Sequence, residues 1–246
     1  MPIVEVRGLT KTYGSGDTTV AALDSVNMSV DAGEFVAVMG PSGCGKSTLL
    51  NLVGGLDKPT SGQVLIDGTD IATMSDSTVT RLRRRNLGFV FQFFNLIPVL
   101  TVTENAALPL TLDGTSQTAA RAKAAEWLEK VGLGNKLGSR PDQLSGGQQQ
   151  RVAVARALVT DPALVLADEP TGNLDTKSAD EIAELLKQAA DEWGRAVVMV
   201  THDPHIASHA GRIVFMRDGR IVDDVTIKGD DPAASARAAM EKAGLL

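Results

Sequence analysis

The chain has 246 residues, of which 43% are hydrophobic and 22% are charged, and its formal net charge is -6. This length can bury one sizeable core, and we expect a single domain over residues 1-246. The negative charge argues against a nucleic-acid partner, because neutralising phosphates needs a surplus of Lys and Arg on one face. A dense basic cluster does occur around residues 81–85, and we interpret it as a solvated helix end.

The termini and the single cysteine indicate the compartment. The first seven residues lack the basic region, apolar stretch and cleavage site of a signal peptide. No apolar run reaches the roughly 18 residues that a membrane-spanning helix needs. Cys44 alone excludes an internal disulfide framework and is compatible with a reducing compartment. We therefore expect a protein at the cytoplasmic face of the membrane, attached only through a partner.

Short apolar or alternating segments predict strands, and the first of them look antiparallel. Asp218-Gly219 is a strong hairpin signal between the last two. The expected strands cover residues 3–6, 25–30, 35–39, 63–67, 88–91, 164–167, 197–201, 213–217 and 220–224.

Helical spacing is clearest at 46–53, 118–131 and 147–159. Strands that alternate with helices imply a largely parallel sheet, so the helical block reads as an insertion into an α/β core. We expect core segments 1-91 and 161-228, a helical subdomain at 92-160 and a tail at 229-246. The composition of the tail fits a terminal helix or a frayed end.

A phosphate-binding motif follows the apolar segment 35–39 and opens the helix at 46–53. Its residues are Gly40-Pro41-Ser42-Gly43-Cys44-Gly45-Lys46-Ser47. Glycines let main-chain N–H groups surround phosphates, Lys46 reaches the terminal phosphates, and the Ser47 hydroxyl can hold Mg²⁺. The motif predicts an α/β P-loop NTPase (RecA-like) core with an N-terminal antiparallel β subdomain and an inserted α-helical subdomain.

Two acidic residues end the apolar segment 163–168. Asp168 lies at the carboxyl end of a predicted buried strand, where parallel α/β sheets bind ligands. We expect Asp168 to bind Mg²⁺, and the adjacent Glu169 to orient or deprotonate the attacking water.

A second candidate phosphate site is Leu144-Ser145-Gly146-Gly147-Gln148, called here the signature segment. Ser145 is a good helix cap, and the glycines leave N–H groups open to an anion. One nucleotide hardly needs two helix starts from the same chain. The second start therefore suggests a nucleotide held by another copy.

In motif order and over nearly its whole length, the chain resembles the ATP-binding subunit of an ATP-binding cassette (ABC) transporter. The resemblance implies that Tyr13 stacks on adenine near Val20, and that Ser145 and Gly147 close on the ATP of a second copy. The expected ATP-binding residues are Tyr13, Val20, Gly40, Pro41, Ser42, Gly43, Cys44, Gly45, Lys46, Ser47, Thr48, Ser145, Gly146, Gly147 and Gln148.

The resemblance also assigns catalytic and interface roles. Gln92 would link the Mg²⁺ site to the helical subdomain, and His202 would contact the γ-phosphate. Asp175, in Gly172-Asn173-Leu174-Asp175, would lie at the interface of a homodimer. The expected catalytic residues are Glu169, His202, Lys46 and Gln92, and the expected Mg²⁺ ligands are Ser47, Gln92 and Asp168.

Four of the six phenylalanines lie around Gln92, at Phe89, Phe91, Phe93 and Phe94. We interpret the first two as core residues. The apolar side chains that follow fall in an expected surface loop, where they indicate a protein contact. By resemblance this loop receives a transmembrane permease, and its expected contacts are Phe93, Phe94, Leu96 and Ile97.

Residues 83–98 and 103–105 resemble the subgroup that serves lipoprotein release, macrolide and peptide export, and cell division. This resemblance implies an ATPase that powers a permease for export or for force transmission outside the membrane. The alternatives are a regulatory adaptor ATPase of the cell-division type that moves no substrate, and a soluble ABC ATPase of translation or DNA repair. GTPase and kinase functions are disfavoured because no guanine-binding N-K-x-D motif occurs.

Two further hypotheses concern single side chains. The helix N-terminus could lower the pKa of Cys44 and make it reactive, although simple loop filling explains it better. His202, His205 and His209 are spaced like a metal cluster, but a γ-phosphate contact explains His202 alone.

Overall fold

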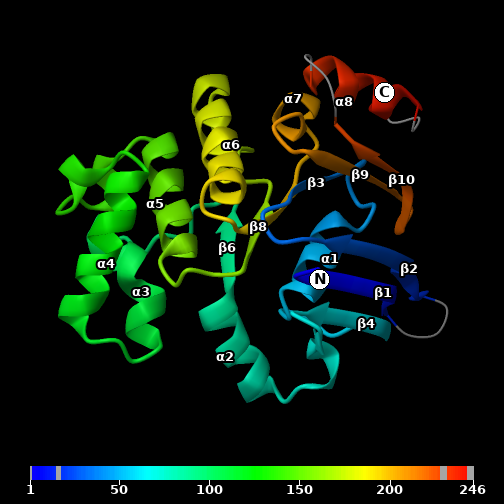
Figure 1. Ribbon diagram of the computed structural model, residues 1–246, viewed down its shortest axis with the longest axis horizontal. Helices are drawn as coiled ribbons and strands as arrows, with labels where there is room; N and C mark the ends of the chain where they lie inside the picture. The colour runs from blue at the N-terminus through cyan, green and yellow to red at the C-terminus, as the bar shows by residue number, and fades with distance from the viewer. Residues whose placement is uncertain (1, 15–17, 228–231, 243–246) are drawn as a thin grey trace.

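The computed structural model describes residues 2–14, 18–227 and 232–242. Its N-terminal part is a four-stranded antiparallel sheet with the order β2-β1-β4-β5 (Figure 1). Val4 of the central strand pairs with Val30 on one side and Ile66 on the other. The predicted antiparallel start is confirmed. The strands are β1 Val4–Tyr13, β2 Val20–Val30, β4 Ser61–Ile66 and β5 Thr69–Asp70.

The second sheet has six strands in the order β10-β9-β3-β8-β7-β6. Every pair in it is parallel except the last hairpin, β9 with β10. Asp218 and Gly219 both have positive φ, as a tight hairpin turn requires, so the predicted hairpin is confirmed. The strands are β3 Phe35–Met39, β6 Leu87–Phe91, β7 Leu164–Asp168, β8 Ala196–Val200, β9 Arg212–Arg217 and β10 Arg220–Thr226.

The inner strands of the six-stranded sheet are buried on both faces, and their side chains alternate between two cores, whereas the edge strand β10 is exposed or half-buried. Val36 and Val38 of β3 point to one core, which contains helix α1 Lys46–Val53 and the antiparallel sheet. Phe35, Ala37 and Met39 point to the other core, which the later helices cover. This arrangement explains why β3 is apolar throughout instead of alternating.

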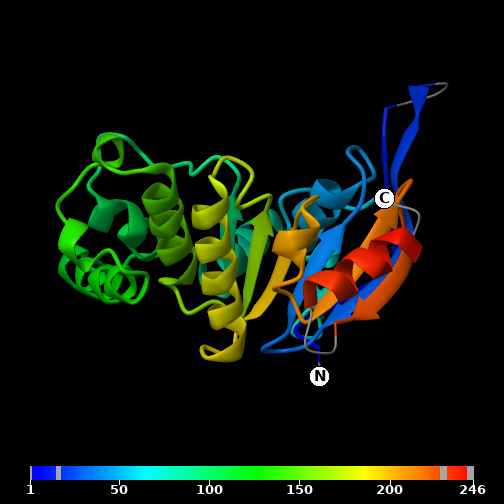
Figure 2. The same ribbon diagram turned by 90° about the horizontal axis from the view of Figure 1, so that it is seen from above.

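The helical subdomain lies at one end of the elongated molecule (Figure 2). It consists of α3 Val102–Leu112, α4 Gln117–Lys130 and α5 Gly146–Leu158. Trp127 of α4 meets Trp193 edge to face, with ring centroids 4.9 Å apart. Arg151 of α5 donates to Glu181 at 2.8 Å. These contacts fix the subdomain against α6 Thr176–Asp191.

The remaining helices include segments that the sequence patterns did not predict. The helix α2 Asp76–Asn86 has the basic cluster in its second half. Arg83 and Arg84 are half-buried and donate to the carbonyl oxygens of Gly55 and Leu112, so the cluster is solvated only in part. The tail forms α8 Pro232–Lys242, which packs beside α7 Pro204–Ala207 (Figure 2). Residues 15–17 and the tail residues 229–231 and 243–246 lie outside the described residues. Among the described helices, none is long and apolar enough to cross a membrane.

Candidate functional site

Four neighbouring parallel strands end in one row. Val38 of β3, Val200 of β8, Asp168 of β7 and Phe91 of β6 are successive partners across the sheet. The carboxyl edge of such a sheet is where ligands bind. The segments that follow these residues are therefore neighbours, and they carry the phosphate loop, His202, Glu169 and Gln92.

The phosphate loop, residues 40–47, is held by close main-chain contacts. Gly40 has φ 153°, and a Cβ there would lie 2.1 Å from the Met216 carbonyl oxygen. Gly45 has φ 103°, and a Cβ there would lie 2.3 Å from the Ala22 carbonyl oxygen. Larger residues cannot occupy these positions without moving the main chain.

Lys46 is buried at the centre of the loop. Its Nζ donates to the carbonyl oxygens of Gly40 and Pro41, at 2.7 and 3.0 Å. Lysine has three ammonium donors, and a phosphate oxygen is the stronger, charged acceptor. The side chain is thus already directed toward the space that the loop encloses.

Cys44 does not have the environment of a reactive thiol. Its side chain is buried, and this burial raises the pKa of the thiol despite the nearby Lys46 ammonium. The hypothesis of a lowered pKa is wrong, since desolvation outweighs the helix N-terminus. Cys44 instead fills the loop, where its N–H donates to the Pro41 carbonyl at 3.3 Å.

Ser47 and Asp168 form a pair suited to a divalent cation. The Ser47 hydroxyl donates to Asp168 Oδ1 at 3.0 Å. Burial raises the pKa of Asp168, and the charge of Glu169 adds to the effect. A hydroxyl and a carboxylate are ligands that Mg²⁺ prefers, and a cation there would relieve the cost of the buried charge. These residues fit an Mg²⁺ site.

Glu169 and His202 face each other across the ends of β7 and β8. His202 Nδ1 lies 3.0 Å from both carboxylate oxygens of Glu169. Glu169 has φ 47°, a conformation that non-glycine residues rarely adopt, while its N–H donates to Val200. The strained main chain aims the carboxylate toward the histidine.

Gln92 connects the end of β6 to the loop that follows Glu169. Its Nε2 donates to Asn173 Oδ1 at 3.4 Å, and Asn173 Nδ2 donates back to the Gln92 carbonyl at 3.0 Å. Asp175, two residues later, caps α6 by accepting from the Ser178 N–H at 3.0 Å. These hydrogen bonds connect the segment around Gln92 to the loop that leads into α6.

Tyr13 lies on the antiparallel sheet, beside its cross-strand partner Val20. Both side chains are well exposed. The Tyr13 hydroxyl donates to Asp57 Oδ2 at 2.9 Å and also hydrogen-bonds Thr48 in the first turn of α1. These contacts orient the ring beside α1, the helix that follows the phosphate loop, and the exposed ring offers a surface on which an adenine base could stack.

The signature segment begins α5 in the helical subdomain. Ser145 Oγ accepts from the Gln148 N–H at 3.3 Å, and Gln148 Oε1 accepts from the Ser145 N–H at 3.1 Å, forming a capping box. A Cβ on Gly147 would lie 2.8 Å from Ser178 Oγ of α6. The α5 helix is separated from α1 by α6 and β6 (Figures 1 and 2). The two candidate phosphate sites therefore occupy different parts of one chain.

The phenylalanines around Gln92 differ from the prediction. Phe89 and Phe91 are only half-buried, and their rings stack with centroids 5.9 Å apart. Both line an apolar groove of about 380 Å³ that α3 closes with Leu108 and Pro109. Phe89 still packs against the core that contains α1, as predicted, whereas Phe91 belongs to neither core, because β6 is the edge strand of its sheet. Of the expected permease contacts, Phe93 and Ile97 are exposed, whereas Phe94 and Leu96 are half-buried.

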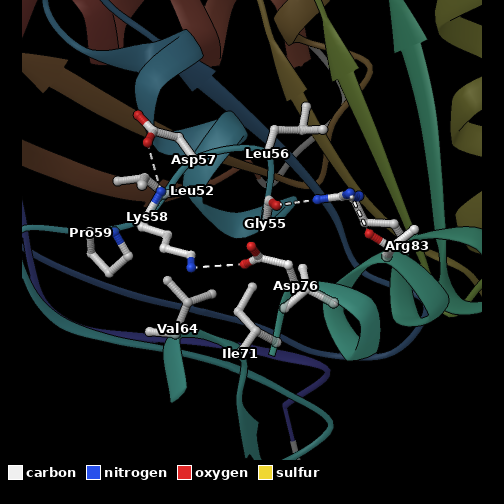
Figure 3. A pocket seen from close by; sticks show the side chains of 13 residues that line it. Leu52, Gly55, Leu56, Asp57, Lys58, Pro59, Val64, Ile71, Asp76 and Arg83 are labelled. Carbon is white, nitrogen blue, oxygen red and sulfur yellow. Dashed lines mark hydrogen bonds and ion pairs between the residues drawn. The ribbon is translucent and has the colours of Figure 1, made fainter. Parts of the chain in front are cut away.

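Another pocket, of about 390 Å³, lies near the C-terminal end of α1 (Figure 3). Lys58 Nζ lies 2.8 Å from Asp76 Oδ1 across it, and Arg83 donates to the Gly55 carbonyl. These charges are paired with their neighbours. The pocket lies at the far end of α1 from the phosphate loop.

Comparison with known sequences identifies the family. The sequence profile described as "ABC transporter" matches residues 23–172, more than half of the chain. The chain belongs to the ABC transporter family. It is an ATP-hydrolysing cassette, and the predicted P-loop NTPase core with a β subdomain and a helical insertion is confirmed.

Several relatives of this cassette have names. It is 49% identical to the lipoprotein-releasing system ATP-binding protein LolD of Geobacter metallireducens, over 90% of this chain and 99% of LolD. It is 45% identical to the macrolide export ATP-binding/permease protein MacB of Hyphomonas neptunium, over 96% of this chain but 36% of MacB. The predicted subgroup is confirmed.

A solved structure extends the similarity to the fold. The dimeric MJ0796 cassette of Methanocaldococcus jannaschii, in a post-hydrolysis state with ADP and Pi, superimposes with a TM-score of 0.83 at 45% identity. The match covers 92% of this chain and 100% of that chain.

Two residues that connect parts of the cassette, Gln150 and Arg156, belong to none of the predicted motifs. The buried Gln150 of α5 donates to the carbonyl oxygens of Phe91 and Pro170, at 3.0 and 2.5 Å. It ties the helical subdomain to the ends of β6 and β7. Arg156 donates to the carbonyl oxygens of Phe94 and Asn95, at 2.8 and 2.6 Å, and holds the loop beside the groove. Gln and Arg in a helix normally indicate a solvated face, so spacing alone does not reveal these roles.

Proposed function

We propose that this cassette dimerises around two ATP molecules and powers a separate membrane permease, for export or for force transmission outside the membrane. The observation that carries the proposal is the row of strand ends that brings Lys46, Asp168, Glu169 and His202 to one edge of the sheet. The similarity to LolD and MacB supports a role in a transporter of this subgroup.

Hydrolysis follows from the positions of the charged groups. The phosphate loop and Lys46 bind the phosphates, and Glu169 accepts a proton from the water that attacks the γ-phosphorus. The bond from the γ-phosphorus to the bridging oxygen breaks, and ADP leaves. His202, held by Glu169, contacts the γ-phosphate and senses its presence. Ser47, Asp168 and Gln92 would hold Mg²⁺, which supplies positive charge beside the phosphates.

The second copy completes the site. Ser145 caps α5 and Gly147 lies in its first turn, and α5 and α1 lie in different parts of the chain (Figures 1 and 2). We assign them to the ATP of the opposite copy, with Asp175 at the interface. In this arrangement, bound ATP holds two cassettes together head to tail, and hydrolysis of the ATP allows them to separate. The free energy of ATP binding therefore drives the conformational change that powers the permease.

The permease contact is assigned to the loop after Gln92, through Phe93, Phe94, Leu96 and Ile97. Through this contact the cassette would lie at the cytoplasmic face of the membrane. The second candidate function is a regulatory adaptor that moves no substrate, favoured by the resemblance of the Gln92 segment to the cell-division members of the subgroup.

The proposal is tested by purifying tagged Glu169→Gln protein from its own membranes in mild detergent, with magnesium and ATP. Mass spectrometry is expected to find a stoichiometric permease with few spans and a large extracytoplasmic domain. Ribosomal or DNA-repair partners without an integral membrane protein would instead indicate a soluble ABC ATPase.

A further inference from the structure

A cluster of metal-binding side chains lies outside the ATP site, between α6 and α7. The chain has three histidines, and His202 is paired with Glu169. His205 and His209 instead converge on Asp180 of α6. The metal cluster of three histidines considered from the sequence therefore does not form, and a carboxylate replaces His202.

The geometry of the cluster is convergent. His205 Nε2 lies 2.7 Å and His209 Nε2 lies 3.5 Å from the same oxygen, Asp180 Oδ1. Among the described residues, these three side chains form a group whose ligand atoms all lie within 4.8 Å of one another. A tetrahedral ion with ligand bonds of about 2.0–2.2 Å separates its ligands by roughly 3.4 Å. Small rotations of partly exposed side chains suffice to reach this spacing.

A fourth side chain supports His209. Its other ring nitrogen, Nδ1, lies 3.5 Å from Glu184 Oε2. Histidines that bind metals commonly donate their second N–H to a carboxylate, which fixes the tautomer and the ring orientation. Glu184 stands one helical turn after Asp180, just as His209 stands four residues after His205. Two carboxylates thus face two imidazoles across the helices.

We propose that Asp180, His205 and His209 bind a late first-row divalent metal ion, with Zn²⁺ as its principal occupant, and that Glu184 orients His209. Imidazole ligands favour Zn²⁺, Ni²⁺ and Cu²⁺ over Mg²⁺ and Ca²⁺, which prefer oxygen. Three protein ligands leave the fourth position to water.

A metal ion at this position would connect two helices that follow residues of the ATP site. The α6 helix starts directly after Asp175, and α7 begins two residues after His202. The two helices lie side by side in both views (Figures 1 and 2). An ion bound to both would fasten the segment after His202 to the helix that follows Asp175.

The test uses tag-free protein, because an added histidine tag would itself bind zinc. Isothermal titration with Zn²⁺ is expected to give one site per chain, and affinity should fall at least tenfold in both His205→Ala and His209→Ala. Glu184→Gln should weaken binding less than either histidine variant, because it removes only the support of His209 and leaves all three ligands in place. Co²⁺ substitution should produce the intense visible absorption of a tetrahedral site. Mg²⁺ should not compete.

Two matched variants separate this site from the ATP site. His202→Ala removes the remaining histidine, and Asp168→Asn removes the carboxylate assigned to Mg²⁺; both are expected to bind zinc as the wild type does. A wild-type protein that binds no Zn²⁺ would overturn the proposal. Zinc binding that survives in both His205→Ala and His209→Ala, or that disappears in Asp168→Asn, would also overturn it.

Discussion

His202 Nδ1 lies 3.0 Å from both carboxylate oxygens of Glu169, and the contact joins the ends of two neighbouring parallel strands. The histidine thereby touches the group expected to accept a proton from water. Any change that moves β8 against β7 alters this contact.

Replacing Glu169 with Gln should lower the rate of ATP hydrolysis by roughly 100-fold or more, because the amide cannot accept the proton. ATP binding should persist, since the phosphate loop is unchanged. Light scattering at saturating ATP is expected to find a stable dimer of the variant. A variant that stays monomeric there would contradict the two-copy mechanism.

Tyr13→Ala should weaken ATP binding roughly tenfold, because stacking of a base on an aromatic ring contributes about 1–3 kcal/mol. Tyr13→Phe is the matched control: it keeps the ring and loses the hydroxyl with its hydrogen bonds to Asp57 and Thr48. Its affinity should remain close to wild type. Equilibrium binding of a fluorescent ATP analogue measures both, and equal losses would show that the hydroxyl, not the ring, matters.

The motifs indicate the candidate site because each occupies a short segment whose local structure is dictated by its own residues. The phosphate loop needs glycines at positive φ before a helix, and Asp168 ends a strand apolar enough to be buried on both faces. The contact of Glu169 with His202 could not be predicted in this way. It depends on β8 lying between β3 and β7, and strand order is a property of the whole sheet.

The segments that escaped prediction have physical reasons too. The sequence patterns do not predict α6. The family resemblance assigns its cap, Asp175, to an interface, and the polar face of the helix is rich in charged residues. The β1 strand continues to Tyr13 through register shifts, which interrupt the alternation that indicates a strand. Phe91 looks like a core residue until β6 is known to be an edge strand.

Asp57 should make the stability of the antiparallel sheet depend on pH. Burial alone would raise the pKa of Asp57, but hydrogen bonds from Lys11, Lys58 and Tyr13 outweigh it and lower the pKa. A carboxylate with a lowered pKa stabilises the folded state above its unfolded pKa of about 3.9, and this contribution is lost as the pH falls through the folded value.

Asp57→Ala should therefore lower the melting temperature at pH 7, by an amount equivalent to about 1–2 kcal/mol of lost hydrogen bonds. Below about pH 4 the difference from wild type should shrink. Thermal unfolding followed by circular dichroism at several pH values measures it. Tyr13→Phe removes one of the three hydrogen bonds and should give a smaller loss; a difference independent of pH would refute the argument.

Asn105 should hold the loop beside the groove in place. This fully buried side chain accepts from the Ile97 N–H at 2.7 Å and donates to the carbonyl oxygens of Ile97 and Leu100, at 3.1 and 3.2 Å. Asn105→Ala removes all of these hydrogen bonds and leaves the Ile97 N–H without its side-chain acceptor, so unfolding in urea should show a loss of about 2–3 kcal/mol. Thr103→Ala, which removes a single hydroxyl bond to the Leu137 carbonyl, should cost less.

The permease contact can be tested without disturbing the core, because two candidate side chains are exposed. Phe93 is 70% exposed and Ile97 is 38% exposed on the loop after Gln92. Phe93→Glu and Ile97→Glu should each weaken permease binding roughly tenfold, because a charge there must be desolvated in the complex. ATP hydrolysis by the isolated cassette should not change. Val222→Glu, at a position 41% exposed on the edge strand β10, is the matched control and should bind the permease normally. If all three variants bound the permease equally well, the contact would lie on another face of the cassette.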